Sequence, residues 1–212
     1  MTIFTDDFTG TSGDNVSART GWNKYGSGTT DVFQINASNG TKIAGTFPDD
    51  GAMYGQDPAD VAHFCEAVLT SNAISSNCAA ALCLRVTDRN DYLGVYYDTS
   101  STNWRIYSFG GGSSLGTWAG AAPSGETYRA EISSAHVVTV YKDETLVNTL
   151  DVSTGFGASG QATATKVGCL AKAVTAGFDP WIDAWRSGLV SDLAGGSSIV
   201  PILNSQRQFA GA

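Results

Sequence analysis

The sequence is short of charge, histidine and long apolar runs, and each shortage narrows what the chain can be. Only 15% of its 212 residues are charged. No apolar run reaches the roughly 20 residues that a membrane-spanning helix needs. The net charge of -8, without any cluster of Lys or Arg, disfavours nucleic acid because phosphates repel an acidic surface. We therefore expect a globular protein with no membrane insertion and no nucleic acid partner.

Metal and redox motifs are also missing. The cysteines Cys65, Cys78, Cys83 and Cys169 form neither a C-x-x-C pair nor a common zinc pattern. We expect buried free thiols, with a disulfide as the open alternative. The first residues lack the basic start and apolar run of a signal peptide, so we expect synthesis in a cytoplasm.

Short apolar or alternating runs, separated by Gly, Ser, Thr and Asp, are what the sequence does contain, and they favour strands and turns. Twelve such runs predict an all-β chain of two packed sheets. The runs cover residues 3–8, 32–35, 41–44, 62–69, 79–86, 92–98, 104–109, 128–132, 137–142, 145–151, 166–171 and 182–190. Asn39-Gly40 and residues 142–145 predict hairpins. Residues 71–77 and 110–125 are predicted surface loops.

A Gly-Ser joint at residues 194–198 predicts where the β domain ends. We expect a sandwich over residues 1–193, followed by a joint and an extended arm over 194–212. The arm is apolar where a disordered tail would be polar. Its expected docking residues are Ile199, Val200, Pro201, Ile202, Leu203 and Phe209. We expect docking on a neighbouring subunit, and docking on the parent sandwich is the alternative.

Four segments carry a resemblance to a known family: AAALCLRVTDRNDYLGVYYDTSSTNWRIYSF, ETYRAEISSAHVVTVYKDETLVNTLDV, KVGCLAKA and WIDAWRSG. Their order resembles the concanavalin A-like superfamily, which includes laminin-G-like domains, legume-type lectins and family-16 glucanases. The resemblance covers roughly residues 1–190 and implies a jelly-roll sandwich of two curved antiparallel sheets.

The same resemblance implies a structural calcium site near the first and last strands, at Asp6, Asp7 and Asp183. The loop at residues 88–91 is a second candidate, because hard cations take carboxylate and carbonyl oxygens. The alternative is that Asp serves here only as a turn-forming residue. We expect no required cofactor.

Enzymatic motifs are absent. A glucanase of this superfamily carries a Glu-x-Asp-x-(x)-Glu strand, because a retaining glycosidase needs two carboxylates about 5 to 5.5 Å apart. None of the four glutamates has an acidic residue two positions away on a predicted strand. We therefore predict no enzymatic activity, with a pair from separate strands, such as Glu131 and Asp98, as the alternative.

Sugar binding requires aromatic faces and planar polar groups. Alternation places Tyr96 and Asp98 on one face of their strand, and Arg129 and Glu131 on one face of another. The predicted sugar-binding residues, lining one exposed concave groove, are Tyr96, Asp98, Trp104, Arg129, Glu131 and Tyr141. Ordinary cross-strand pairing on a solvated sheet is the alternative.

Three functions are compatible with these features. The first is a non-enzymatic structural or decoration protein of a particle such as a bacteriophage virion. It would be made in the cytoplasm and assembled with copies of itself or with other virion subunits through the arm. The second is a carbohydrate-binding adhesin for surface glycans, and the third is an atypical glycoside hydrolase. We rank them in that order.

Overall fold

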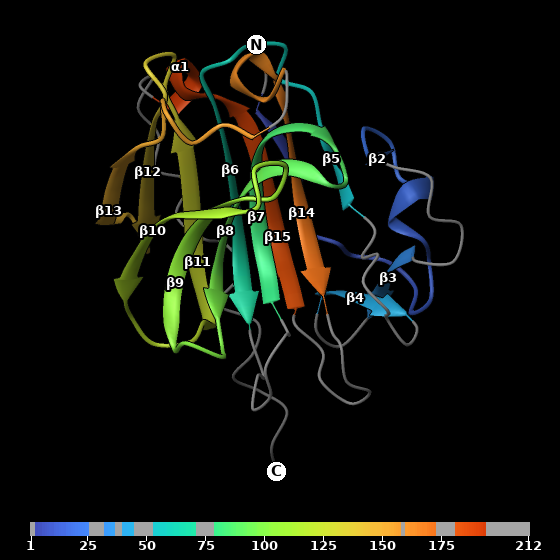
Figure 1. Cartoon of the computed structure of the whole chain (residues 1–212). Helices are drawn as coiled ribbons and strands as arrows, with labels where there is room; N and C mark the ends of the chain where they lie inside the picture. Colours follow the sequence, from blue (N-terminus) through green and yellow to red (C-terminus); the bar gives the residue numbers. More distant parts are fainter. Residues whose placement is uncertain are drawn as a thin grey trace.

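The chain forms a sandwich of two antiparallel sheets, as a computed structural model shows (Figure 1). The structure describes residues 3–25, 32–36, 40–44, 53–70, 79–157, 160–172 and 181–193. No helix among these residues is long and apolar enough to cross a membrane. The all-β jelly-roll class predicted from the sequence is confirmed.

The first sheet, which we call sheet A, has the strand order β13-β12-β11-β6-β15-β4-β3, and β1 also pairs with β15. Its strands are β1 (Phe4–Asp6), β3 (Val32–Asn36), β4 (Gly40–Ala44), β6 (His63–Thr70), β11 (Ser124–Ile132), β12 (Val137–Lys142), β13 (Thr145–Asp151) and β15 (Trp181–Leu189).

The second sheet, sheet B, has the order β10-β9-β8-β7-β14-β5-β2 and faces the viewer in Figure 1. Its strands are β2 (Asn23–Tyr25), β5 (Met53–Gln56), β7 (Ala79–Asp88), β8 (Asp91–Asp98), β9 (Asn103–Ser108), β10 (Ser113–Ala119) and β14 (Lys166–Lys172). The described residues also contain three short helical segments: η1 (Val16–Ala18), η2 (Gln161–Thr163) and α1 (Val190–Leu193).

The described residues include all twelve predicted strands and three further strands that were not predicted. β10 lies inside residues 110–125, where the prediction of a loop is wrong: pairing with β9 overrides the low strand propensity of its Gly and Ser. β2 and β5 are only three and four residues long and show too little alternation to be recognised. The predicted loop at 71–77 lies outside the described residues.

Both predicted hairpins are present as paired strands, but Gly40, expected in the turn of the first one, is instead the first residue of β4. β3 and β4 pair from Val32 and Ala44 to Asn36 and Gly40. β12 and β13 pair up to Lys142 and Thr145. Asp143 and Glu144 between them have φ of 48° and 63°, as expected at the two central positions of a tight β-hairpin turn.

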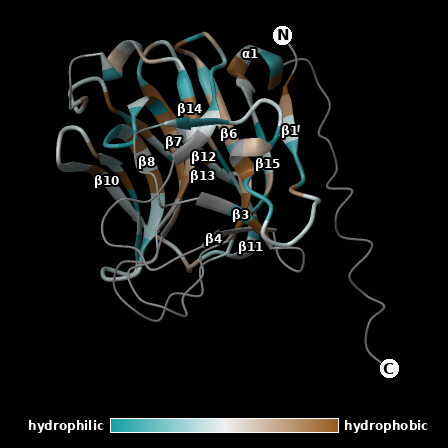
Figure 2. Cartoon of the chain, turned by 90° about the vertical axis from the view of Figure 1, so that its right-hand side faces the viewer, coloured by the Kyte–Doolittle hydropathy of each residue, from teal (hydrophilic) through white to brown (hydrophobic). Residues whose placement is uncertain are grey.

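The core lies between the sheets and is built from alternate residues of each strand. Leu93 and Val95 of β8 point inward, as do Tyr128 and Ala130 of β11, as alternation predicts. Figure 2 shows hydrophobic residues in brown interspersed with white and teal residues along the strands. Burying one face of each strand is what holds the two sheets together.

The three cysteines within the described residues are free and buried, as predicted. Burial raises the pKa of the Cys65, Cys83 and Cys169 thiols, so these groups stay protonated and unreactive. Cys78 lies outside the described residues.

Candidate functional site

Five aromatic residues gather on the outer face of sheet B, and we call this surface the aromatic face. They are Tyr25, Tyr92, Tyr96, Tyr107 and Phe109. Phe109 stacks on Tyr92 with 4.3 Å between ring centroids, and its ring lies 4.9 Å from Tyr107 and 6.0 Å from Tyr96. Tyr92 is buried beneath this group, whereas Tyr96, Tyr107 and Phe109 keep part of their surface in solvent.

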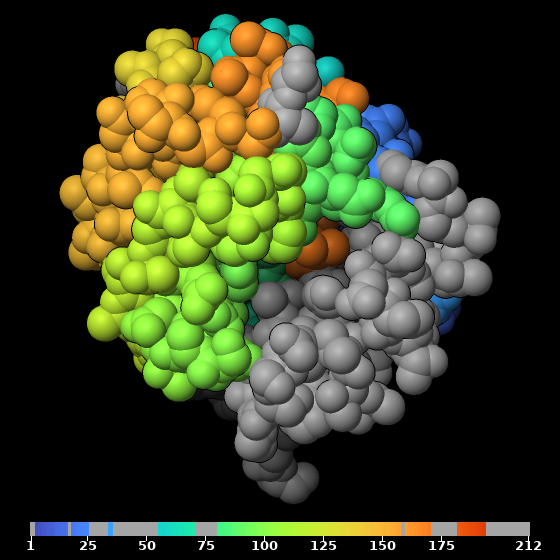
Figure 3. Space-filling view, in the orientation of Figure 1, coloured from blue at the N-terminus to red at the C-terminus, as the bar shows by residue number. Residues whose placement is uncertain are grey.

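Small residues form the floor of the aromatic face. Gly55, Gly168, Ala81, Cys83 and Gly94 occupy outward positions on four neighbouring strands. A Cβ atom on Gly94 would lie 2.7 Å from Phe109 Cε2, so only glycine lets the Phe109 ring lie over β8. Figure 3 shows green and yellow-green atoms, from β7 to β10, at the front of the molecule.

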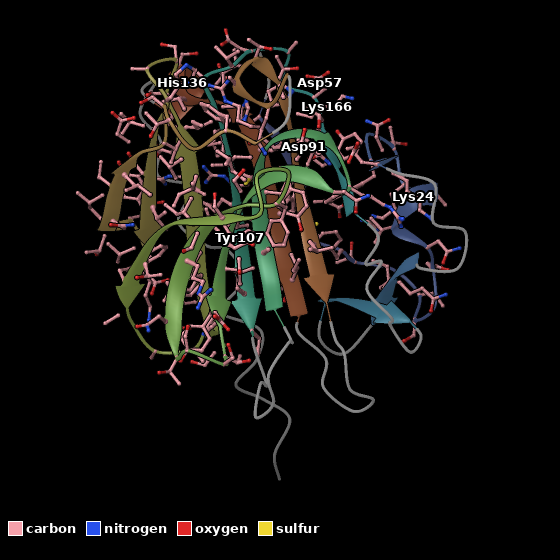
Figure 4. All side chains as sticks on the ribbon, viewed as in Figure 1. Lys24, Asp57, Asp91, Tyr107, His136 and Lys166 are labelled. Atoms are coloured by element: carbon pink, nitrogen blue, oxygen red, sulfur yellow. The ribbon has the colours of Figure 1, made fainter. Side chains whose placement is uncertain are left out.

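Polar groups lie at the end of the aromatic face formed by β2, β5 and β14. Lys166 Nζ is 5.3 Å from the centre of the Tyr25 ring. The Tyr25 hydroxyl is buried without a hydrogen-bond partner, and burial together with the nearby Asp57 charge raises its pKa. Asp57 accepts a 2.7 Å hydrogen bond from the Thr165 hydroxyl. Figure 4 shows Asp57 and Lys166 near the upper end of sheet B, above Tyr107.

The opposite rim of the aromatic face carries an ion pair. Arg105 Nη2 lies 2.7 Å from Asp98 Oδ2, and Arg105 is the cross-strand neighbour of Tyr96. Burial alone would raise the pKa of Asp98. Hydrogen bonds from Ser100 and Ser101, together with the Arg105 charge, nevertheless hold that pKa below its usual value. The surface therefore combines partly exposed aromatic rings with polar groups at both ends.

The predicted sugar-binding residues do not form one groove. Tyr96 and Asp98 lie on the outer face of sheet B. Arg129, Glu131 and Tyr141 lie on the outer face of sheet A, on the other side of the sandwich. Alternation had predicted the faces of β8 and β11 correctly, but it carries no information about which sheet a strand joins.

Trp104 corrects another part of that prediction. It is 1% exposed, packs in the core and donates a hydrogen bond from Nε1 to the Ala121 carbonyl. Its neighbours Arg105 and Tyr107 face outward instead. The residues that the prediction missed on the aromatic face are Tyr25, Tyr107 and Phe109. Of these, Tyr107 could have been found from the alternation within residues 104–109.

On sheet A, Arg129 is the centre of an ion-pair network. Its guanidinium lies 2.7 Å from Glu131, 2.6 Å from Glu144 and 3.4 Å from Glu66, and its Cζ is 4.4 Å from the centre of the Tyr141 ring. These contacts join neighbouring strands, as cross-strand pairs do. Burial raises the pKa of Glu66, an effect that Arg186 and Arg129 oppose.

The carboxylates Glu131 and Asp98, considered above as a catalytic pair, lie on different sheets and on opposite outer faces. They therefore cannot flank one glycosidic bond at the spacing that hydrolysis requires. The alternative of a catalytic pair at these two residues is therefore excluded, for the same reason: the sequence does not show the sheet to which each strand belongs.

The three aspartates expected at a calcium site are not brought together. Asp6 pairs with Trp185 in register and points inward, whereas Asp183 lies opposite Val68 and points outward. A bulge at Ala184, with φ of 49°, separates Asp183 from Trp185 and reverses the face that strict alternation predicts.

Each of the first two aspartates has protein partners of its own. Asp6 accepts hydrogen bonds from Arg19 Nε at 2.8 Å, from Trp22 Nε1 at 2.7 Å and from the Phe8 amide at 2.8 Å. Asp7 accepts from the Thr9 amide and hydroxyl, and chiefly the amide bond lowers its pKa. Asp6 therefore serves as an internal anchor for the segment that follows β1.

The aspartates of the loop at residues 88–91 accept hydrogen bonds from residues in or next to the same loop. Asp88 accepts from the Asn90 amide, and Asp91 accepts a 2.6 Å bond from the Thr87 hydroxyl. Across the part of the chain that the structure describes, no group of three or more His, Cys, Asp or Glu residues could hold a metal ion. The six predicted docking residues of the arm lie outside the described residues.

No protein-family model and no curated protein matches the sequence. Solved structures do match. Crh5 transglycosylase in complex with NAG aligns with a TM-score of 0.60 and 14% identity over 89% of this chain and 84% of that chain. A galectin-like protein of unknown function from Bacillus subtilis gives a TM-score of 0.57 and 9% identity, covering 88% of this chain and 94% of that chain.

The exoplasmic/lumenal domain of VIP36, solved bound to Ca2+ and Man3GlcNAc, gives a TM-score of 0.54 and 9% identity over 85% of this chain and 86% of that chain. At such low identity these similarities establish the fold alone. Together with the strand order they show that this chain has a concanavalin A-like β-sandwich fold, as the resemblance in its sequence implied.

Proposed function

We propose that this protein is a non-enzymatic carbohydrate-binding module that holds a saccharide on the aromatic face of sheet B. The observation that carries the proposal is the group of partly exposed rings, Tyr96, Tyr107 and Phe109, beside a floor of small residues. Ring faces pack against the C-H groups of a pyranose, while polar groups at the edges bond its hydroxyls. Solved structures of the same fold in complex with NAG and with Man3GlcNAc support the choice of ligand class.

The charged groups beside the aromatic face favour binding over hydrolysis. A general acid for glycoside cleavage needs a raised pKa. Asp98 has a lowered one, and both of its carboxylate oxygens are engaged by Ser100, Ser101 and Arg105. We therefore assign Asp98, the carboxylate at the rim of the aromatic face, a hydrogen-bonding role and not that of a general acid.

Tyr107→Ala is expected to weaken saccharide binding by about two- to tenfold, because an aromatic contact contributes roughly 0.5–1.5 kcal/mol beyond its buried area. Calorimetric titration with chitooligosaccharides and mannose oligosaccharides, chosen after a glycan array, would measure it. The matched control is Tyr141→Ala, a half-buried tyrosine on sheet A. No binding of the wild type to any glycan, or an equal loss in both variants, would contradict the proposal.

The particle-decoration role depends on the arm at residues 199–212, which lies outside the described residues, and it stays a prediction. It is a separate hypothesis from sugar binding and has its own test. Deletion of residues 195–212 followed by light scattering would test it, with a smaller molar mass as the expected result.

A further inference from the structure

β13 is an apolar strand at the edge of sheet A. Within the described residues only β12 pairs with it, so its outer side presents unpaired backbone N–H and C=O groups. Figure 1 shows it at the left-hand edge of the sandwich. Its Leu146 and Val147 are 56% and 36% exposed, and among the described residues they are the only large hydrophobic side chains that are exposed. An edge of this kind favours pairing with an added strand.

Self-pairing of β13 between two copies of the chain is disfavoured by charge. A symmetric antiparallel pair centred on Asn148 would place Asp151 of each copy opposite Thr145 of the other copy, next to Glu144. Like charges would then meet at both ends of the pair. The added strand should therefore be apolar and free of acidic side chains.

The C-terminal arm has that composition. Residues 194–212 contain no acidic side chain, and their only charged side chain is Arg207. Acidic residues flank β13 at both ends, so Arg207 would meet an opposite charge in either strand direction. Pro201 is compatible with this role, because an added strand becomes the new edge of the sheet and proline is tolerated on edge strands.

We propose that residues 199–203 of one copy of this chain add as a strand to the outer side of β13 in a second copy. The apolar side chains of the arm then cover Leu146 and Val147. The place beside β13 lies five strand spacings from β15 of the same copy, about 24 Å along sheet A. The joint at residues 194–198 spans at most about 18 Å, so a second copy is the better acceptor. This interface is separate from the aromatic face and does not depend on sugar binding.

Light scattering on the full chain tests the proposal. The wild type should have the molar mass of two or more chains. Leu146→Lys places a charge on the exposed edge strand, and Ile202→Asp places one in the arm, so each should reduce the molar mass to that of one chain. Asn23→Lys, at an exposed position on β2 at the far edge of sheet B, is the matched control and should keep the wild-type mass. A monomeric wild type, or an oligomer that survives in Ile202→Asp, would overturn the proposal.

Mixing the two monomeric variants provides a second test. Leu146→Lys keeps an intact arm, and Ile202→Asp keeps an intact β13. The mixture should therefore form dimers with one chain of each variant, because one arm can still pair with one edge strand. A mixture that stays monomeric would contradict arm exchange between copies. Saccharide binding should be unchanged in both variants, so failure of this interface leaves the sugar-binding proposal standing.

Discussion

Asp6→Ala should lower the free energy of unfolding by about 3 kcal/mol, the scale expected when one partner of a buried hydrogen-bonded ion pair is removed. The Asp6 side chain is 7% exposed, and Arg19 Nη2 lies 2.5 Å from its Oδ1. Its removal leaves the Arg19 guanidinium, the Trp22 indole N–H and the Phe8 amide without their shared acceptor. The Trp22 ring packs on Trp185 in the core, with 5.6 Å between the ring centroids. Loss of the Trp22 hydrogen bond should therefore also weaken packing in the core. Urea denaturation followed by tryptophan fluorescence would measure it.

The comparison variant is Asp183→Ala on the opposite face of sheet A, where the side chain accepts a hydrogen bond from the neighbouring Ala184 amide, and it should cost less stability than Asp6→Ala. The same experiment separates the anchor from a calcium site. If Asp6 and Asp183 shared a calcium ion, both variants would lose a similar amount of stability, and a chelator would destabilise the wild type to the same level. We expect the two variants to differ and a chelator to have no effect.

Acidification should destabilise the fold through His63. Burial lowers the pKa of His63 from 6.5 to about 4, an effect that the nearby Arg85 charge increases. The ring is held neutral, with Nδ1 bonded to the Asp60 carbonyl at 2.8 Å and Nε2 accepting from the Arg85 amide at 3.2 Å. Protonation would turn Nε2 from an acceptor into a donor that faces another donor.

The direction in which stability changes with pH follows from proton linkage. The unfolded chain binds this proton near pH 6.5 and the folded chain only near pH 4. The stability contributed by His63 is therefore fully present above about pH 6.5 and is lost as the pH falls toward 4, by about 3 kcal/mol. Burial raises the pKa of Glu66, so that residue has the opposite trend.

Comparison with His63→Gln isolates the histidine contribution. The stability difference between wild type and variant, measured by urea unfolding at several pH values, should shrink as the pH falls from 6.5 to 4. A difference that stays constant across this range would contradict the account, because it would mean that His63 does not titrate differently in the folded and unfolded chains.

Local alternation was enough to predict most of the fold. In β8, alternation predicted that Leu93 and Val95 face the core and that Tyr96 faces outward, and both are observed. It failed where one extra residue shifts the register. Because of the bulge at Ala184, Asp183 and Trp185 lie on opposite faces of the sheet. No pattern in the neighbouring residues predicts this bulge.

The candidate site was harder to predict because it depends on long-range pairing. Tyr96 and Arg129 each have the outward orientation that the sequence indicates. They belong to different sheets because β8 pairs with β7 and β9, whereas β11 pairs with β6 and β12. The aromatic face also depends on β2, which contributes Tyr25 from a strand of three residues.

An NMR titration tests the central claim most directly. With chitooligosaccharide or a mannose oligosaccharide added to the labelled protein, we expect the largest amide and aromatic shift changes at Tyr96, Tyr107 and Phe109, with residues around Arg129 and Tyr141 unchanged. Shift changes centred on the Arg129 network of sheet A, without shift changes on the aromatic face, would contradict the claim that sheet B holds the saccharide.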